Sequence, residues 1–378
     1  MTRLCVSRIS RLAISIVLIM LGVTQPSWVA VNAYGEGWYS SWQLRKAITI
    51  DATKVSSGPH TNFPVLVNLS SDASLASRAQ SDGDDILFTS SDGATKLSHE
   101  IEKYGSSTGE LIAWVKVPSL PSTSNTVLYM YYGNDAVASQ QDATNVWDSN
   151  YKGVWHLKES GDHIGNDYLD STTNANHGIG GSGTASAVPT QIAGKIGNAN
   201  DFDGTDDYIN FGSGASLDIS GSVITLSMWV NADAIGTQWH TIDRYPCYFI
   251  DILANAKYYF STNDNPTVTG ATSVTAGTWR HVVGVKTTTQ LLLYLGGTQD
   301  GVTASALALN DTCTGTILGK FSGGGYQFNG KFDEVRISNI DRSAGWILTE
   351  YNNQGTPTTF YAVGAATSSP ANFFKLFE

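Results

Sequence analysis

The sequence predicts an all-β protein, and three features of its composition carry this prediction. Charged residues make up 15% of the 378 residues, well below the roughly 25% of an ordinary soluble domain. The chain holds 38 Gly together with 10 Trp, 17 Tyr and 13 Phe. Helix surfaces are usually built from Lys, Glu, Arg and Ala, whereas Thr, Val and Tyr suit pleated strands and Gly suits tight turns. The length allows two domains, each with a core of its own.

The charge balance excludes one class of partner. Lys and Arg number 22 against 33 Asp and Glu, which gives a net charge of −11 at pH 7. Binding to nucleic acid is driven largely by release of counterions from phosphates, and an acidic protein works against that term. We therefore expect no nucleic-acid partner.

Residues 1–33 read as a signal peptide. Three arginines and no acid accompany an apolar run over Leu12–Val23, and Val31 and Ala33 fit the small-residue positions of a cleavage site. Cleavage would change the net charge from −11 to −14. An uncleaved anchor is the alternative, and it is the only route by which we expect contact with a membrane. Either way the protein is expected to be secreted or exposed on the cell surface.

The mature chain retains two cysteines, Cys247 and Cys313. In an exported protein such a pair forms a disulfide more often than a metal site, and two cysteines without a histidine cluster cannot complete tetrahedral zinc. We therefore predict a Cys247–Cys313 disulfide.

The first half, residues 34–150, reads as a β-sandwich. Apolar residues recur at every second position in several short runs, which is the spacing of half-buried strands. The runs of Ser, Asp and Gly at 81–85 and 91–93 have the chemistry of turns. The predicted strands are 45–50, 63–69, 86–88, 111–117 and 127–132.

Motifs in this half resemble the domain family DUF2341, a β-rich extracytoplasmic domain without an assigned activity. They are the strings at 42–50, 63–67, 82–88, 99–102, 114–118 and 131–134, in that order. Members of the family also occur fused to proton-channel components of the ExbB/TolQ/MotA type. That association makes a structural or assembly subunit of an envelope complex one alternative function.

The second half, residues 151–363, resembles the concanavalin A-like, LamG-type jelly roll. The resemblance lies in ordered strings at 153–157, 169–171, 174–178, 194–199, 202–209, 224–230, 279–283 and 330–337. Strict alternation in Ile224–Val230, and strands at 290–295 and 316–320, agree with it. A helix is predicted over Ser343–Tyr351 with Ser343 as its cap, and residues 364–378 read as a linker-like tail.

Resemblance to this jelly roll implies one structural calcium ion. The positions it indicates are Asp170 in an early loop and Asp333 on a late strand, with Asn176 or nearby carbonyls completing the oxygen ligands. In the alternative interpretation Asp170 begins an Asx-turn and Asp333 accepts hydrogen bonds from backbone amides.

The residues do not predict a catalytic site. Paired acids of a glycosidase must lie on one strand face, so the adjacent Asp333 and Glu334 are expected to point to opposite faces. Glu100 and Glu102 have the right parity, but Ile101 is the expected buried neighbour and Lys103 follows, so we expect a solvated face. A glycan-active hydrolase or lyase remains an alternative and would need two titratable groups that converge in a cleft.

Aromatic side chains beside variable-looking loops are candidates for a saccharide site. We single out Trp239, Tyr245, Tyr248 and Tyr326, whose rings could stack on a pyranose face. The leading hypothesis is a non-catalytic binding or adhesion protein whose jelly roll binds a glycan or another surface ligand. The identity of that ligand and the oligomeric state stay open.

Overall fold

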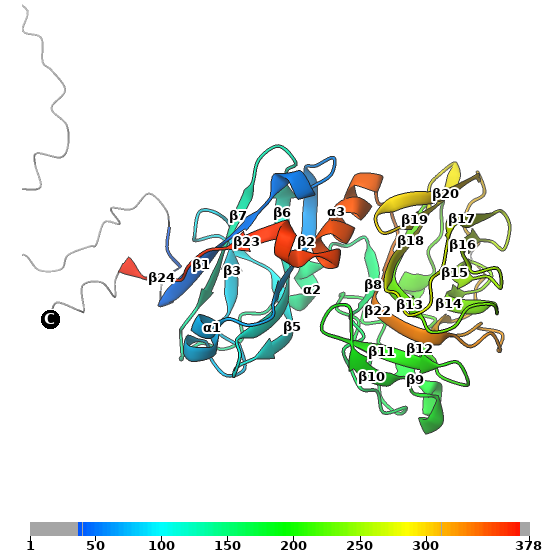
Figure 1. Ribbon diagram of the computed structural model, residues 1–378, viewed down its shortest axis with the longest axis horizontal. Helices are drawn as coiled ribbons and strands as arrows, with labels where there is room; N and C mark the ends of the chain where they lie inside the picture. Colours follow the sequence, from blue (N-terminus) through cyan, green and yellow to red (C-terminus); the bar gives the residue numbers. More distant parts are fainter. Residues whose placement is uncertain (1–36, 40, 311, 371–378) are drawn as a thin grey trace, which may run out of the picture. The chain divides into compact units, whose positions relative to one another are not determined.

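The computed structural model describes residues 37–39, 41–310 and 312–370, and the chain from Trp38 onward forms one compact unit. The leader predicted over residues 1–33 lies outside the described residues. No helix in the described part of the chain is both long and apolar enough to cross a membrane. The chain folds into two β-sandwiches, as predicted (Figure 1).

The first sandwich packs two antiparallel sheets against each other. One sheet has the order β23-β1-β7-β3-β4 with β24 also on β1, and the other has the order β2-β6-β5. Short helices η2 (Ala52–Lys54) and α1 (Ala73–Arg78) lie between strands of the two sheets, and α2 (Ala143–Val146) lies between β7 and the second sandwich. The strands are β1 (Leu44–Ile50), β2 (His60–Leu69), β3 (Leu87–Thr89), β4 (Lys96–Leu97), β5 (His99–Gly105), β6 (Glu110–Leu120), β7 (Thr126–Tyr132), β23 (Tyr361–Val363) and β24 (Thr367–Ser368).

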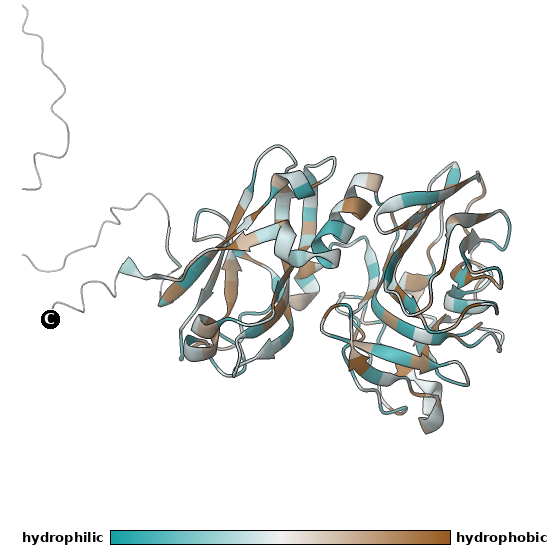
Figure 2. Cartoon of the chain, viewed as in Figure 1, coloured by the Kyte–Doolittle hydropathy of each residue, from teal (hydrophilic) through white to brown (hydrophobic). Residues whose placement is uncertain are grey.

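Alternation of apolar residues explains the core of this sandwich. Ile48 and Ile50 on β1 belong to the same buried cluster as Val65 and Val67 on β2. All five strands predicted in this half are confirmed to within a few residues. Figure 2 shows how apolar and polar residues succeed one another along the strands.

The second sandwich is a larger jelly roll. Its eight-stranded sheet has the order β10-β11-β22-β13-β18-β19-β20 with β8 on β22, and its seven-stranded sheet has the order β17-β16-β15-β14-β21-β12-β9. Neighbouring strands are mostly distant in sequence, which is typical of jelly rolls. The eight-stranded sheet contains β8 (Tyr151–Trp155), β10 (Thr190–Ala193), β11 (Asn198–Asp203), β13 (Ile224–Ala232), β18 (Arg280–Lys286), β19 (Gln290–Leu295), β20 (Thr298–Ala304) and β22 (Asn329–Ser338). The seven-stranded sheet contains β9 (Ile179–Gly180), β12 (Ile209–Gly212), β14 (Trp239–Arg244), β15 (Tyr248–Ile252), β16 (Lys257–Thr262), β17 (Thr267–Ser273) and β21 (Thr316–Leu318).

The seven-stranded sheet presents two different faces. Along β15, Tyr248, Ile250 and Ile252 enter the core of the sandwich, so Phe249 and Asp251 point to the opposite face. On β16, Tyr258 and Phe260 also enter the core, so Tyr259 between them points to that opposite face. This outer face of the sheet carries the candidate site.

The C-terminal segment returns to the first sandwich, which differs from the predicted division at residue 363. Helix α3 (Ala344–Gly355) begins where the sequence indicates, with the Ser343 hydroxyl accepting from the Trp346 amide. After α4 (Pro357–Phe360), strand β23 pairs antiparallel with β1, and β24, inside the expected linker-like tail, pairs with the start of β1 (Figure 1). The first sandwich is therefore built from both ends of the described chain.

Candidate functional site

An aromatic groove of about 400 Å³ lies on the outer face of the seven-stranded sheet. Five rings form it, and the imidazole of His240 lies among them, with ring centroids 5.0 Å from Phe321 and 5.3 Å from Tyr326. The remaining lining residues are Gln238, Asp251, Leu253 and Asp264. The five rings are Tyr245, Phe249, Tyr259, Phe321 and Tyr326.

The loop between β21 and β22 supplies two of the rings through a tight turn. The amide of Gly324 donates to the carbonyl of Phe321, and the amide of Phe321 donates to the carbonyl of Gly325. Tyr326 follows with φ +55°, a left-handed conformation that a bulky residue rarely adopts. Its ring is 51% exposed at the edge of the groove. Strain of this kind concentrates at binding sites, which makes Tyr326 a candidate contact residue.

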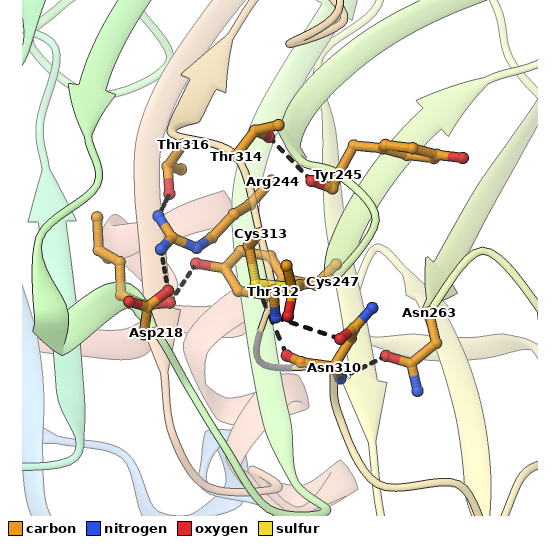
Figure 3. The surroundings of a disulfide bond; sticks show 12 residues. Asp218, Arg244, Tyr245, Cys247, Asn263, Asn310, Thr312, Cys313, Thr314 and Thr316 are labelled. Atoms are coloured by element: carbon orange, nitrogen blue, oxygen red, sulfur yellow. Dashed lines mark hydrogen bonds and ion pairs between the residues drawn. A yellow bond between two sulfur atoms is a disulfide. The ribbon is translucent and has the colours of Figure 1, made fainter.

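Tyr245 occupies the turn between β14 and β15, and a disulfide lies beside it. Cys247 and Cys313 are bonded with their Cα atoms 5.7 Å apart, which confirms the predicted pair. The amide and hydroxyl of Thr314 both donate to the carbonyl of Tyr245, at 3.0 and 2.9 Å. Figure 3 shows the ring of Tyr245 extending away from the disulfide. The turn that carries Tyr245 is thus anchored to the segment before β21.

A buried polar set lies at the floor of the groove. Nδ1 of His240 is 3.0 Å from Oδ1 of Asp251 and 3.2 Å from Oδ2 of Asp243. Both carboxylates are fully buried, and Gln238 donates to Asp251 at 3.4 Å. Burial, with repulsion from Asp243, raises the pKa of the Asp251 carboxyl well above its usual range.

The structure brings two of the four predicted saccharide-binding aromatics into the groove. Tyr245 and Tyr326 line it, whereas Tyr248 is buried in the core and donates to the carbonyl of Leu217. Trp239 packs against the same core.

Sequence reasoning missed three groove rings, Phe249, Tyr259 and Phe321, and the polar pair His240 and Asp251. Two of these rings could have been predicted from strand alternation, because Phe249 and Tyr259 alternate with core residues on their strands and so point to the outer face. His240 lies beside a register shift on β14, which a simple alternation could not place.

The two acids expected to bind calcium accept hydrogen bonds from backbone amides in this structure. Both oxygens of Asp170 are occupied by donors, namely the amides of Val154, Thr172 and Asn176 and the hydroxyl of Thr172. This is the Asx-turn that the sequence left as the alternative. Asp333 accepts from the amide of Ile196 and belongs to a different cluster. The calcium ion expected at Asp170 and Asp333 stays a prediction, and to bind it Asp170 would have to exchange these hydrogen bonds for the ion.

A second polar cluster is buried where the two sandwiches meet. The indoles of Trp114 and Trp147 donate to Glu102 and Glu100, at 3.0 and 3.1 Å. Nε2 of His156 lies 3.4 Å from Glu100. The expectation of a solvated face for Glu100 and Glu102 is wrong, because the second sandwich covers it.

Asp333 and Glu334 also depart from the predicted parity. The pairing of β13 with β22 shifts in register between Ser227 and Trp229, and Glu334 on β22 has φ +55°. Such a bulge brings adjacent side chains toward one environment. Glu334 meets Nδ1 of His156 at 2.8 Å, and repulsion between Asp333 and Glu334 contributes, after burial, to raising the pKa of Asp333.

Two groups of acids and histidine in the described chain bring their ligand atoms within 4.8 Å of one another. Glu102, His156 and Glu334 form the first, which is fully buried in the ion-pair cluster just described. The second is a partly exposed turn in which burial raises the pKa of Asp207 to about 6. It is formed by Asp203, Asp206 and Asp207. Neither group contains Asp170 or Asp333.

Comparison with known families confirms the two resemblances in the predicted order. Residues 82–156 match the domain of unknown function DUF2341. Residues 203–348 match the concanavalin A-like lectin/glucanases superfamily, and the whole aromatic groove lies within them. None of the curated proteins matches the chain.

The solved structures similar to this chain include a domain of an arabinanase, the binding domain of a mosquitocidal protein and a sialidase. Domain 4 of AbnA, an extracellular arabinanase from Geobacillus stearothermophilus in complex with arabinotriose, is 19% identical over 54% of this chain and 98% of that chain, with a TM-score of 0.43. The binding domain of Paraclostridial Mosquitocidal Protein 1 is 11% identical over 53% and 52%, with a TM-score of 0.43. The Trypanosoma rangeli sialidase in complex with the inhibitor DANA is 10% identical over 67% and 43%, with a TM-score of 0.40. At such low identities and TM-scores, these similarities do not indicate a function for this chain.

Proposed function

We propose that this chain is a non-catalytic saccharide-binding protein of the cell exterior and that the aromatic groove is its binding site. One observation carries the proposal: five rings and a buried polar set converge on the outer face of a sheet inside the lectin-like region. Saccharide rings present apolar faces edged by hydroxyl groups. A groove that combines aromatic faces with a few fixed hydrogen-bonding groups matches both.

The binding test is a glycan and polysaccharide array with the full chain, run with and without calcium, followed by calorimetric titration of each hit. Tyr245→Ala and Tyr326→Ala each remove a groove ring that is partly or largely exposed, so each should weaken binding about tenfold. Tyr104→Ala removes a half-buried tyrosine of the first sandwich and serves as the matched control. Equal affinity of all three variants and the parent would show that the groove is not the site.

A glycan hydrolase is the second candidate, favoured by the convergence of His240, Asp243 and Asp251. Paired carboxylates act in glycosidases when both reach the scissile bond. Here Asp243 does not line the groove, and the imidazole lies between the two acids, which favours binding over catalysis. Release of reducing sugar from a bound polysaccharide, abolished in Asp251→Asn with binding retained, would reverse this preference.

The proposed exterior location comes from the sequence of the leader, with its arginines before the apolar run Leu12–Val23. The disulfide between Cys247 and Cys313 is consistent with an oxidising compartment. Fractionation of cells that express the full chain, with the N-terminal residue of the mature protein determined by sequencing, tests this part. Recovery of the intact chain in the cytoplasm would contradict it.

A further inference from the structure

The aromatic groove holds acidic side chains and one imidazole. Asp251 lies at its floor, Asp264 at its rim and Asp243 directly behind His240. No lysine or arginine is among the described residues that line the groove. A saccharide entering it therefore meets the exposed carboxylate of Asp264, the buried carboxyl group of Asp251 and no lysine or arginine of the described lining.

The floor of the groove has more acceptor capacity than His240 can satisfy. A single imidazole nitrogen carries at most one proton, yet Nδ1 of His240 faces both Asp243 and Asp251. Asp243 also accepts from the amide of Ser322 at 3.0 Å, whereas Oδ1 of Asp251 makes no other polar contact within the described structure. Donors on a ligand, or a positive charge, would relieve the repulsion between the two acids.

The acidic side chain at the rim of the groove also favours ligands that carry donors or a positive charge. Asp264 is exposed in the turn between β16 and β17, and the hydroxyl of Tyr245 lies 3.1 Å from its carboxylate. A ring stacked on Tyr245 would place its substituents beside this charge. A carboxylate or sulfate there would be repelled, whereas a hydroxyl would donate and an ammonium group would be attracted.

We infer that the groove selects neutral and amine-bearing saccharides and rejects anionic ones. This inference rests on the proposed function and adds the chemical class of the ligand. Like charges placed together at a binding site cost enough to weaken affinity at least about tenfold at low salt. The discrimination should shrink as salt screens the exposed carboxylate of Asp264.

The test uses trisaccharide pairs in which a neutral substituent of one member is replaced by a charged group in the other. Calorimetric titration of the full chain compares galactose with galacturonic acid oligomers, and N-acetylglucosamine with glucosamine oligomers. We expect binding of a neutral or amine-bearing member at least about tenfold tighter than that of the uronate. Asp264→Asn should narrow this ratio and Asp264→Lys should narrow it further. Asp135→Asn removes an exposed charge of the first sandwich and should leave it unchanged.

The outcomes separate the two proposals. If the uronate binds as tightly as its neutral partner and Tyr245→Ala abolishes that binding, the charge selectivity is wrong while the groove remains the saccharide site. An unchanged ratio in both Asp264 variants likewise overturns the selectivity. If no saccharide binds in a way that depends on Tyr245 or Tyr326, the proposed function fails, and the inference fails with it.

Discussion

The buried cluster between the sandwiches contains more acids than bases. Its cations are His156 and Arg336, which are fully buried. Arg336 bonds Glu334 and Glu350, both at 2.6 Å, and lies 4.4 Å from the centre of the Trp114 ring. The acids are Glu100, Glu102, Asp333, Glu334 and Glu350. Unpaired charges are costly in such a place, so some of these acids must keep their protons.

The directions of the pKa shifts show which acids do so. Burial opposes ionisation of Glu100, but His156 outweighs it and lowers the pKa of Glu100 to about 2. Burial and then repulsion from Glu334 raise the pKa of Glu102 to about 8. His156 is held cationic by Glu334 and Glu100, which outweigh its burial and raise its pKa. Burial and repulsion from Glu334 also raise the pKa of Asp333, so Glu102 and Asp333 are the two acids that these shifts favour as neutral.

Replacing Glu102 with Gln should remove part of the alkaline sensitivity of the protein. The folded state holds the Glu102 proton up to about pH 8, whereas an unfolded chain releases it near pH 4.5. Stability from this group is therefore complete below the unfolded pKa and is lost as pH rises toward 8, by an amount on the order of a few kcal/mol. Urea unfolding between about pH 5 and 9 should show a shallower decline for Glu102→Gln than for the parent.

Glu110→Gln is the matched control, since Glu110 is partly exposed and pairs with Lys103. It should follow the parent profile. Parallel profiles for the Glu102 variant and the parent would mean that Glu102 is already ionised in the folded protein.

At the scale of elements, alternation of apolar residues predicted five strands of the first sandwich and agreed with three strands of the second. It failed at Glu334, where the backbone departs from regular pairing, and it gave no placement for His240, which lies beside a register shift on β14. A bulge changes the face of the sheet to which a side chain points. It is defined by the pairing with a partner strand that is distant in sequence, so the local sequence does not predict it. Tyr245 and Tyr326 were found because they lie in loops, whereas Phe249 was not singled out, although its parity marks the outer face.

The disulfide joins two elements that frame the groove, so its loss should affect both stability and binding. Cys247 and Cys313 are separated by 66 residues, a loop for which the chain-entropy account gives about 4 kcal/mol. The double variant Cys247→Ser/Cys313→Ser should lose stability of that order in urea unfolding. It should also bind saccharide less tightly where it remains folded, because the Tyr245 turn loses an anchor. Retained affinity would show that Thr314 alone holds the turn.

At the scale of the whole molecule, the sequence did not reveal that helix α3 joins the sandwiches. Its helical periodicity and cap can be recognised in the sequence, but its partners on the two sandwiches lie 287 and 125 residues away. The side chain of Asn353 accepts from the Leu66 amide at 2.7 Å and donates to the Leu66 carbonyl at 3.0 Å on β2. The neighbouring Gln354 accepts from the indole of Trp229 on β13 at 2.7 Å. One helix thus bonds both sandwiches, which no local pattern can show.

Because α3 serves both sandwiches, we expect them to unfold together. Asn353→Ala leaves two buried backbone groups of Leu66 without their side-chain partner, at a cost of about 2–4 kcal/mol. Amide exchange measured by mass spectrometry in moderate urea should then rise in β2 and also in β13 and β18, which this side chain does not bond. Asn352→Ala removes a single bond to the carbonyl of Lys54 and should have a smaller effect. Faster exchange confined to the first sandwich would show that α3 docks on two independent units, since coupled sandwiches cannot lose protection separately.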